Sequence, residues 1–91
     1  DNYIVAYRGE FAVGEQGNLD YKQSISYSLD YEQAKFFATR FKMLSLTKSV
    51  VYTVKVPVKD VLAYIEREDE VVCLPICMGG KMEVIKEDSL L

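Results

Sequence analysis

Three short clusters of polar and charged residues stand out as candidates for chemistry. They are the ranges Tyr7–Gly9, Ser26–Ser28 and Glu68–Glu70. The chain contains no histidine, so catalysis of the Ser-His-Asp or Cys-His type is excluded, and any chemistry must come from Arg, Lys, Ser, Tyr and carboxylate side chains. Each cluster alone also has a structural explanation. A strand-end arginine is usually solvated or salt-bridged, Ser-x-Ser before a helix is typical of cap and turn chemistry, and an acidic run is usually an exposed turn.

The two cysteines, Cys73 and Cys77, offer little further chemistry. Without histidine, a zinc site at these positions would need carboxylate ligands, so we expect no metal. A disulfide at this spacing is possible only across a tight turn. We therefore expect two reduced, partly buried thiols in a cytoplasmic protein.

Composition and charge predict one globular domain over residues 1–91. Hydrophobic residues make up 49% and charged residues 27% of the 91-residue chain, and the longest apolar run, residues 71–78, is interrupted by Pro75 and too short to span a bilayer. The net charge of -3 makes non-specific nucleic-acid binding unexpected, although it is not excluded. The charge is uneven, because residues 21–59 carry seven bases and two acids, whereas residues 60–91 carry three bases and eight acids.

Hydrophobic patterning predicts several short strands. Residues 3–8 read as a strand that ends at Gly9, followed by a loop to residue 23 and a short extended segment over residues 24–28. Further strands are expected at residues 50–56, 70–74 and 82–86, separated by proline and glycine turns. Residues 61–65 fit either a strand or a single helical turn.

One helix is predicted from about Tyr31 to Met43. Asp30 is its expected N-cap, and Gln33 completes a capping-box-like pattern. The expected inner face carries apolar residues at helical spacing: Ala34, Phe37, Ala38 and Phe41.

These elements predict an α+β fold, in which a small, mainly antiparallel twisted sheet forms two packed halves beside one main helix. The cleft for a ligand would lie between the two halves. Periodicity places four residues in one core: Phe37, Phe41, Val54 and Val72.

The order of the motifs resembles a known family. The chain reads YRG, then SISYSLDYEQAKFFA, then VYTVKVPVKDVLAYIEREDEVVCLP, which is similar to the Arg–Ser–Glu class of the ADP-ribosyltransferase fold found in bacterial toxins, phages and related effectors. In that family an arginine ends the first strand, Ser-x-Ser/Thr precedes a helix with an Ala…Phe-Ala pattern, and Glu-x-Glu opens a later strand. The resemblance covers Tyr3 to Pro75. The other major class uses a histidine, which this chain lacks.

The resemblance implies a role for each matching residue. Arg8 would bind the pyrophosphate of NAD, and Ser26 would hold the nicotinamide ribose and orient Glu70. Tyr27 and Ser28 would flank the site, with the tyrosine ring stacking on the cofactor. The sequence does not decide whether Ser26 or Ser28 occupies the family's serine position.

The two acidic residues would divide the work. Glu70 would stabilise the positive charge that develops on the ribose, whereas Glu68 would engage the acceptor nucleophile. The implied activity is transfer of ADP-ribose from NAD to a macromolecular acceptor, with a protein favoured, as in toxin or phage effectors. The small size of the chain keeps an alternative open: a non-catalytic module of the same fold that binds a protein or a nucleotide.

Overall fold

The computed structural model describes residues 2–13, 25–39 and 46–90, which form six strands, one α-helix and three short 3-10 helices. The elements in chain order are β1 (Tyr3–Val13), β2 (Ser26–Ser28), α1 (Tyr31–Thr39), β3 (Leu46–Pro57), η1 (Val58–Asp60), β4 (Val61–Ile65), η2 (Glu66–Glu68), β5 (Glu70–Cys73), η3 (Ile76–Met78) and β6 (Glu83–Ser89). Residues 61–65 are therefore a strand, the first of the two alternatives that the sequence allowed.

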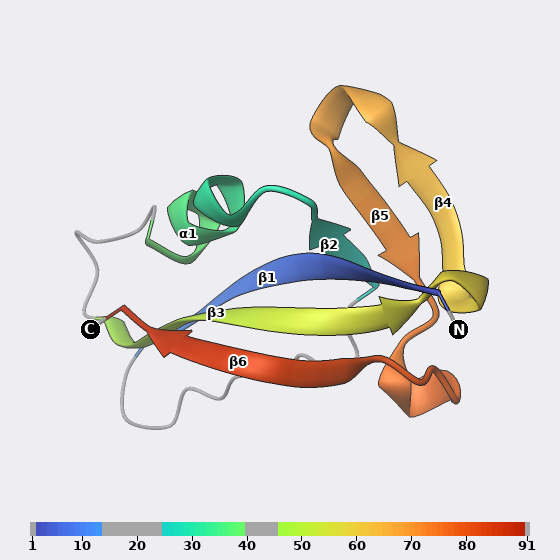
Figure 1. Cartoon of the computed structure of the whole chain (residues 1–91). Helices are drawn as coiled ribbons and strands as arrows, with labels where there is room; N and C mark the ends of the chain where they lie inside the picture. Colours follow the sequence, from blue (N-terminus) through green and yellow to red (C-terminus); the bar gives the residue numbers. More distant parts are fainter. Residues whose placement is uncertain (1, 14–24, 40–45, 91) are drawn as a thin grey trace.

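All six strands join one antiparallel sheet in the order β4-β5-β2-β1-β3-β6. Figure 1 shows β1, β3 and β6 running alongside one another, while the β4–β5 hairpin rises steeply away from them. The short strand β2 links these two halves by pairing with both β1 and β5. The predicted α+β class is confirmed, and the two halves of the sheet are continuous through β2.

Strand β1 is longer than the sequence predicted. It runs through Gly9 to Val13, because β3 supplies hydrogen-bonding partners along its whole length, from Tyr3 opposite Pro57 to Val13 opposite Leu46. The expected strand end at Gly9 is wrong, and so is the expected loop as far as residue 13. The rest of that loop, residues 14–24, lies outside the described residues.

Gly9 is needed for close packing between β1 and the helix. A Cβ atom at this position would lie 2.0 Å from the backbone oxygen of Ala34. The main chains of β1 and α1 therefore approach more closely than any side chain at residue 9 would allow. The same approach explains why α1 faces the sheet with Ala34 and Ala38, both buried.

The helix begins where the sequence predicted, but its details differ. Asp30 caps it, since its Oδ1 accepts the Glu32 amide hydrogen bond at 2.9 Å. The capping box does not form, because Gln33 Oε1 contacts the Ser28 hydroxyl at 3.1 Å. Residues 40–43 of the expected helix lie outside the described residues, as does the predicted core residue Phe41.

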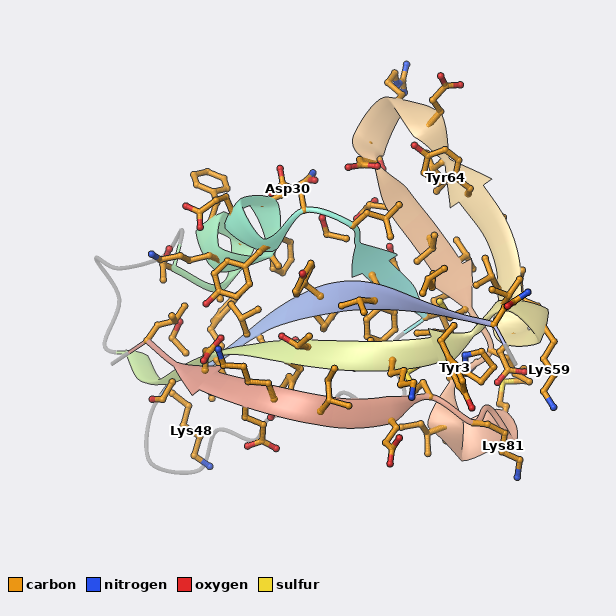
Figure 2. All side chains as sticks on the ribbon, in the orientation of Figure 1. Tyr3, Asp30, Lys48, Lys59, Tyr64 and Lys81 are labelled. Carbon is orange, nitrogen blue, oxygen red and sulfur yellow. The ribbon has the colours of Figure 1, made fainter. Side chains whose placement is uncertain are left out.

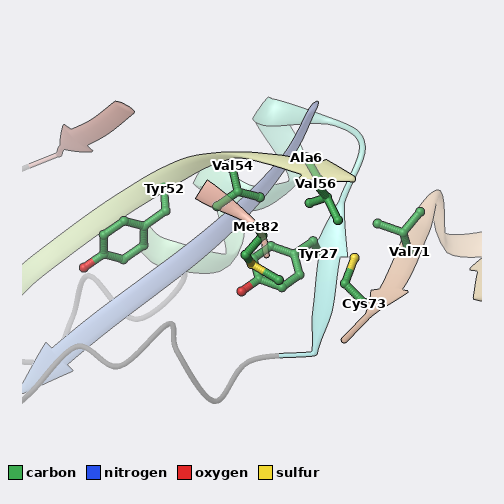
Figure 3. Packing of buried hydrophobic residues seen from close by; sticks show 8 residues of the cluster. All are labelled: Ala6, Tyr27, Tyr52, Val54, Val56, Val71, Cys73 and Met82. Carbon is green, nitrogen blue, oxygen red and sulfur yellow. The ribbon is translucent and has the colours of Figure 1, made fainter. Parts of the chain in front are cut away.

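The main core lies on the face of the sheet opposite α1. It is formed by residues from strands β1, β2, β3 and β5 and from the segment before β6 (Figure 3): Ala6, Tyr27, Tyr52, Val54, Val56, Val71, Cys73 and Met82. A second cluster joins Val51 to the helix residues Ala34 and Ala38. Successive strand residues point to opposite faces, so Val51 and Tyr52 belong to different clusters.

Two of the predicted core residues are misplaced. Phe37 is 37% exposed, because only alanine fits where α1 meets Gly9. Val72 is half-buried, whereas its neighbours Val71 and Cys73 are buried. The side chains of β5 that face the main core are therefore those of Val71 and Cys73 and not that of Val72. Val54 is fully buried as predicted.

Both cysteines are free thiols, with Cys73 buried and Cys77 exposed. Burial, with a smaller contribution from the charge of Asp60, raises the pKa of Cys73 to about 11. Its thiol is therefore protonated at neutral pH and unreactive as a nucleophile. Among the described parts of the chain, no helix has the length and apolar character needed to cross a bilayer.

Candidate functional site

Three of the predicted site residues meet across strands β1, β2 and β5. The Arg8 guanidinium Nη1 donates a hydrogen bond to the Ser26 carbonyl oxygen at 3.0 Å. The Ser26 hydroxyl in turn donates to Glu70 Oε1 at 3.3 Å. Register explains the meeting, since β2 pairs with β1 on one side and with β5 on the other.

These residues line a cavity of about 220 Å³ between the sheet and the start of α1. Its walls come from β1, β2, α1 and the first residue of β5: Tyr7, Arg8, Gly9, Ser26, Ser28, Gln33, Ala34, Phe36, Phe37 and Glu70. The lining therefore combines aromatic rings with a cation, a hydroxyl and a carboxylate.

The Arg8 side chain is held by several neighbours. Its Nε lies 3.5 Å from Glu10 Oε1, and its Cζ lies 5.9 Å from the centre of the Phe37 ring. The Nε atom is nevertheless buried without a hydrogen-bond acceptor among the described residues. With 27% of its side chain exposed, Arg8 is positioned in advance and retains donor capacity, which suits a phosphate ligand.

Glu70 is flanked by a second carboxylate. Glu68 belongs to the 3-10 helix η2, Asp69 adopts the left-handed conformation with φ 51°, and β5 begins at Glu70. The backbone is thus not extended from Glu68 to Glu70, and the strand opens at Glu70, where the sequence predicted its start. The tight turn nevertheless brings the two carboxyl groups within hydrogen-bonding reach.

The surroundings of Glu70 shift its protonation in both directions. Burial raises the pKa of the Glu70 carboxyl, and the hydrogen bond and negative charge of Glu68 raise it further. The Ser26 hydrogen bond and the positive charge of Arg8 lower the same pKa, but the balance is upward. Such a shift is typical of carboxyl groups at functional sites.

If Glu70 acts as a carboxylate, the activity of this site should rise with pH through the raised pKa of that group. For the NAD cleavage that the family resemblance implies, we expect the acidic limb of kcat/KM to lie at a higher pH than the pKa of an ordinary glutamate. In Glu68→Gln the limb should move to lower pH, because the hydrogen bond and charge that raise the pKa are removed. The measurement is a pH–rate profile of the wild type and of Glu68→Gln. An acidic limb at the same pH in both would show that Glu68 does not raise the pKa of Glu70.

Ser28 flanks the cavity as the resemblance implies, whereas Tyr27 does not. The Ser28 hydroxyl accepts the Asp30 amide hydrogen bond at 3.0 Å and thus belongs to the turn before α1. Ser26, not Ser28, contacts Glu70. Tyr27 is 1% exposed in the main core, where Figure 3 shows its ring among apolar neighbours. The predicted stacking role of Tyr27 is wrong, because β2 alternates and turns its middle residue to the opposite face.

Sequence reasoning missed Gln33 as a wall of the cavity and did not single out which aromatic residues line it. A signal was available, because the capping pattern placed Gln33 in the first helical turn, close to the Ser26–Ser28 segment. Phe36 and Phe37 are both exposed and both line the cavity.

Within the described residues, no group of three or more Cys, Asp or Glu residues is arranged to bind a metal ion. Comparisons of the chain with protein-family models, with curated proteins and with solved structures found no match.

Proposed function

We propose that this protein is a mono-ADP-ribosyltransferase that transfers ADP-ribose from NAD to a macromolecular acceptor, in the manner of a toxin or phage effector. The observation that supports this proposal is the hydrogen-bonded series from Arg8 through Ser26 to Glu70 at one cavity. These are the residues that the family resemblance singles out, and they come from three separate strands.

The proposed reaction breaks the bond between nicotinamide and ribose. Nicotinamide leaves with the bonding electron pair, and positive charge develops on the ribose, as in the transition states of glycoside cleavage. A nucleophile of the acceptor then bonds to the same ribose carbon and loses its proton. Water in place of the acceptor gives hydrolysis of NAD.

Each residue of the series would serve one part of this reaction. The Glu70 carboxylate faces the developing charge and is held in place by the Ser26 hydroxyl. Arg8 binds the pyrophosphate with its rigid donor fork. The exposed ring of Phe37 beside Arg8 offers a surface for the nicotinamide.

The size of the cavity limits what it can enclose. At about 220 Å³ it is smaller than the roughly 300–1,000 Å³ usual for ligand pockets. It would therefore enclose the nicotinamide and its ribose, and the adenosine would lie outside. The same small volume favours the second candidate, a non-catalytic module of this fold that binds a protein or a nucleotide.

Incubation with labelled NAD and a cell lysate distinguishes the two candidates. A transferase would label an acceptor protein, and the label would be lost in Glu70→Gln. The module would give neither labelling nor release of nicotinamide, and calorimetry would detect no NAD binding. That second result would overturn the enzyme proposal.

The replacement Arg8→Ala should mainly weaken NAD binding. A phosphate contact exists in the ground state as well as in the transition state, so KM should rise with kcat little changed. Loss of a charged hydrogen bond predicts an increase of about 10- to 100-fold in KM. The matched control is Arg67→Ala, since Arg67 is exposed in η2 and does not line the cavity. A fall in kcat at unchanged KM would contradict the phosphate-binding role.

A further inference from the structure

A second, larger cavity lies at the end of the sheet where β1 and β6 begin. Its volume is about 770 Å³, and three chain segments line it: Asn2 and Tyr3, Pro57 to Lys59, and Gly80 to Glu83. It shares no residue with the cavity of Arg8 and Glu70. Figure 2 shows the labelled side chains of Tyr3, Lys59 and Lys81 gathered at this corner of the molecule.

Buried Asp60 holds two of these segments together. It is 7% exposed, its Oδ2 accepts the Lys81 amide hydrogen bond at 2.8 Å, and its carbonyl accepts the Leu74 amide hydrogen bond at 2.8 Å. Lys59 immediately precedes Asp60 in η1. Two lysines that are far apart in sequence are therefore fixed on the rim of one cavity.

Backbone contacts also fix the segment at Asn2 and the turn at Gly80. The amide of Val58 donates to the Asn2 carbonyl oxygen at 3.0 Å, which fastens the start of β1 to the end of β3. A Cβ atom on Gly80 would lie 2.0 Å from the Leu74 oxygen, so this turn packs against the chain too closely for a side chain. The rim is thus rigidly built from both sides.

The rim combines positive charge with an accessible aromatic ring. Lys59 and Lys81 are exposed, and the Lys55 Nζ lies 4.2 Å from the centre of the Tyr3 ring. The acidic side chain in the lining is Glu83. Tyr3 is 47% exposed, so about half of its surface is open to a ligand. This local excess of lysine occurs in a chain of net charge -3.

We propose that this cavity binds a nucleotide unit, with the phosphate against Lys59 and Lys81 and the base stacked on Tyr3. Lysine ammonium groups bind phosphate as point charges, and an exposed aromatic ring stacks on any base. The volume falls within the usual range for small-ligand sites. An acidic peptide would use the lysines but would leave the ring without a stacking partner, so the nucleotide fits better. This inference does not depend on the proposed transferase activity.

Fluorescence anisotropy with a short fluorescein-labelled oligothymidylate tests the site, with AMP as competitor. We expect binding that is at least about tenfold weaker in the double variant Lys59→Glu/Lys81→Glu. Tyr3→Leu, which keeps an apolar side chain, should weaken binding by roughly fivefold or more through the lost stack. Displacement by AMP would identify the free nucleotide as sufficient, whereas binding of the oligonucleotide without displacement would identify a strand.

The controls separate this site from general charge effects and from the NAD site. Lys35→Glu/Lys48→Glu changes the net charge equally at two other exposed lysines and should leave binding almost unchanged. Arg8→Ala should retain oligonucleotide binding whatever happens to NAD turnover. Equal losses in both lysine pairs would overturn the proposal. The proposal would also be overturned if Tyr3→Leu bound the oligothymidylate as tightly as the wild type and the protein bound an oligoglutamate peptide with the same affinity. The ligand would then be an acidic chain and not a nucleotide.

Discussion

Replacement of Glu70 by glutamine should lower NAD hydrolysis and ADP-ribose transfer together, by about 10²–10³ in rate. Glutamine keeps the shape of the side chain but removes the charge that faces the developing cation. The Ser26 hydroxyl, which donates to Glu70 at 3.3 Å, can also donate to a glutamine oxygen, so the fold should survive. Nicotinamide release and acceptor labelling by the same samples measure both activities.

Two other glutamates act as comparisons for Glu70→Gln. Glu66 is exposed in the same 3-10 helix η2 and does not line the cavity, so Glu66→Gln should keep full activity. Glu68→Gln should spare much of the hydrolysis, since water still reaches the cation, while transfer to the acceptor falls. If Glu68→Gln abolished hydrolysis as completely as Glu70→Gln, the division of roles between the two carboxylates would be wrong.

Gly9→Val should destabilise the protein by about 3 kcal/mol or more, at the upper end of the usual cost of overpacking. The obstacle is the Ala34 backbone oxygen, 2.0 Å from a Cβ at residue 9, so α1 must move away from β1. For a domain of this size the melting temperature should fall by roughly 12–24 °C. Because Ala34, Phe36 and Phe37 line the cavity, NAD binding should weaken as well.

Thermal unfolding followed by circular dichroism measures the effect of Gly9→Val. Ala63→Val is the control, because it also introduces a valine into a strand, but at an exposed position of β4. It should change stability by no more than about 0.5 kcal/mol. A melting temperature of Gly9→Val close to that of the wild type would show that β1 and α1 can separate without cost.

Local signals in the sequence predicted the elements well where one strong pattern dominated. The β-branched run of β3 and the Asp30 cap of α1 needed no tertiary information, because propensity and capping act within a few residues. The extension of β1 through Gly9 could not be predicted this way. It depends on pairing with β3, whose partner residues run from Val51 opposite Gly9 to Leu46 opposite Val13 and so lie far away along the chain, and on packing against α1.

The candidate site was predicted in part for a similar reason. The order of the motifs indicated Arg8, Ser26 and Glu70, and the structure brings these residues together. Side-chain direction was not predictable, because a shift of one residue in a strand exchanges its two faces. That ambiguity explains the burial of Tyr27 and the misjudged Val72. The choice between Ser26 and Ser28 stayed open for another reason, since both lie on the same face of β2 and only the pairing with β5 decides which one reaches Glu70. The turn that joins Glu68 to Glu70 depends on the left-handed conformation of Asp69, which the sequence did not signal.

A crystal structure of Glu70→Gln with bound NAD tests the proposed site most directly, because the variant should bind NAD without consuming it quickly. We expect the nicotinamide and its ribose in the cavity of about 220 Å³, the pyrophosphate on the Arg8 guanidinium, and residue 70 beside the ribose. NAD bound at another surface, or bound in this cavity with its pyrophosphate away from Arg8, would contradict the assignment of these residues to NAD cleavage.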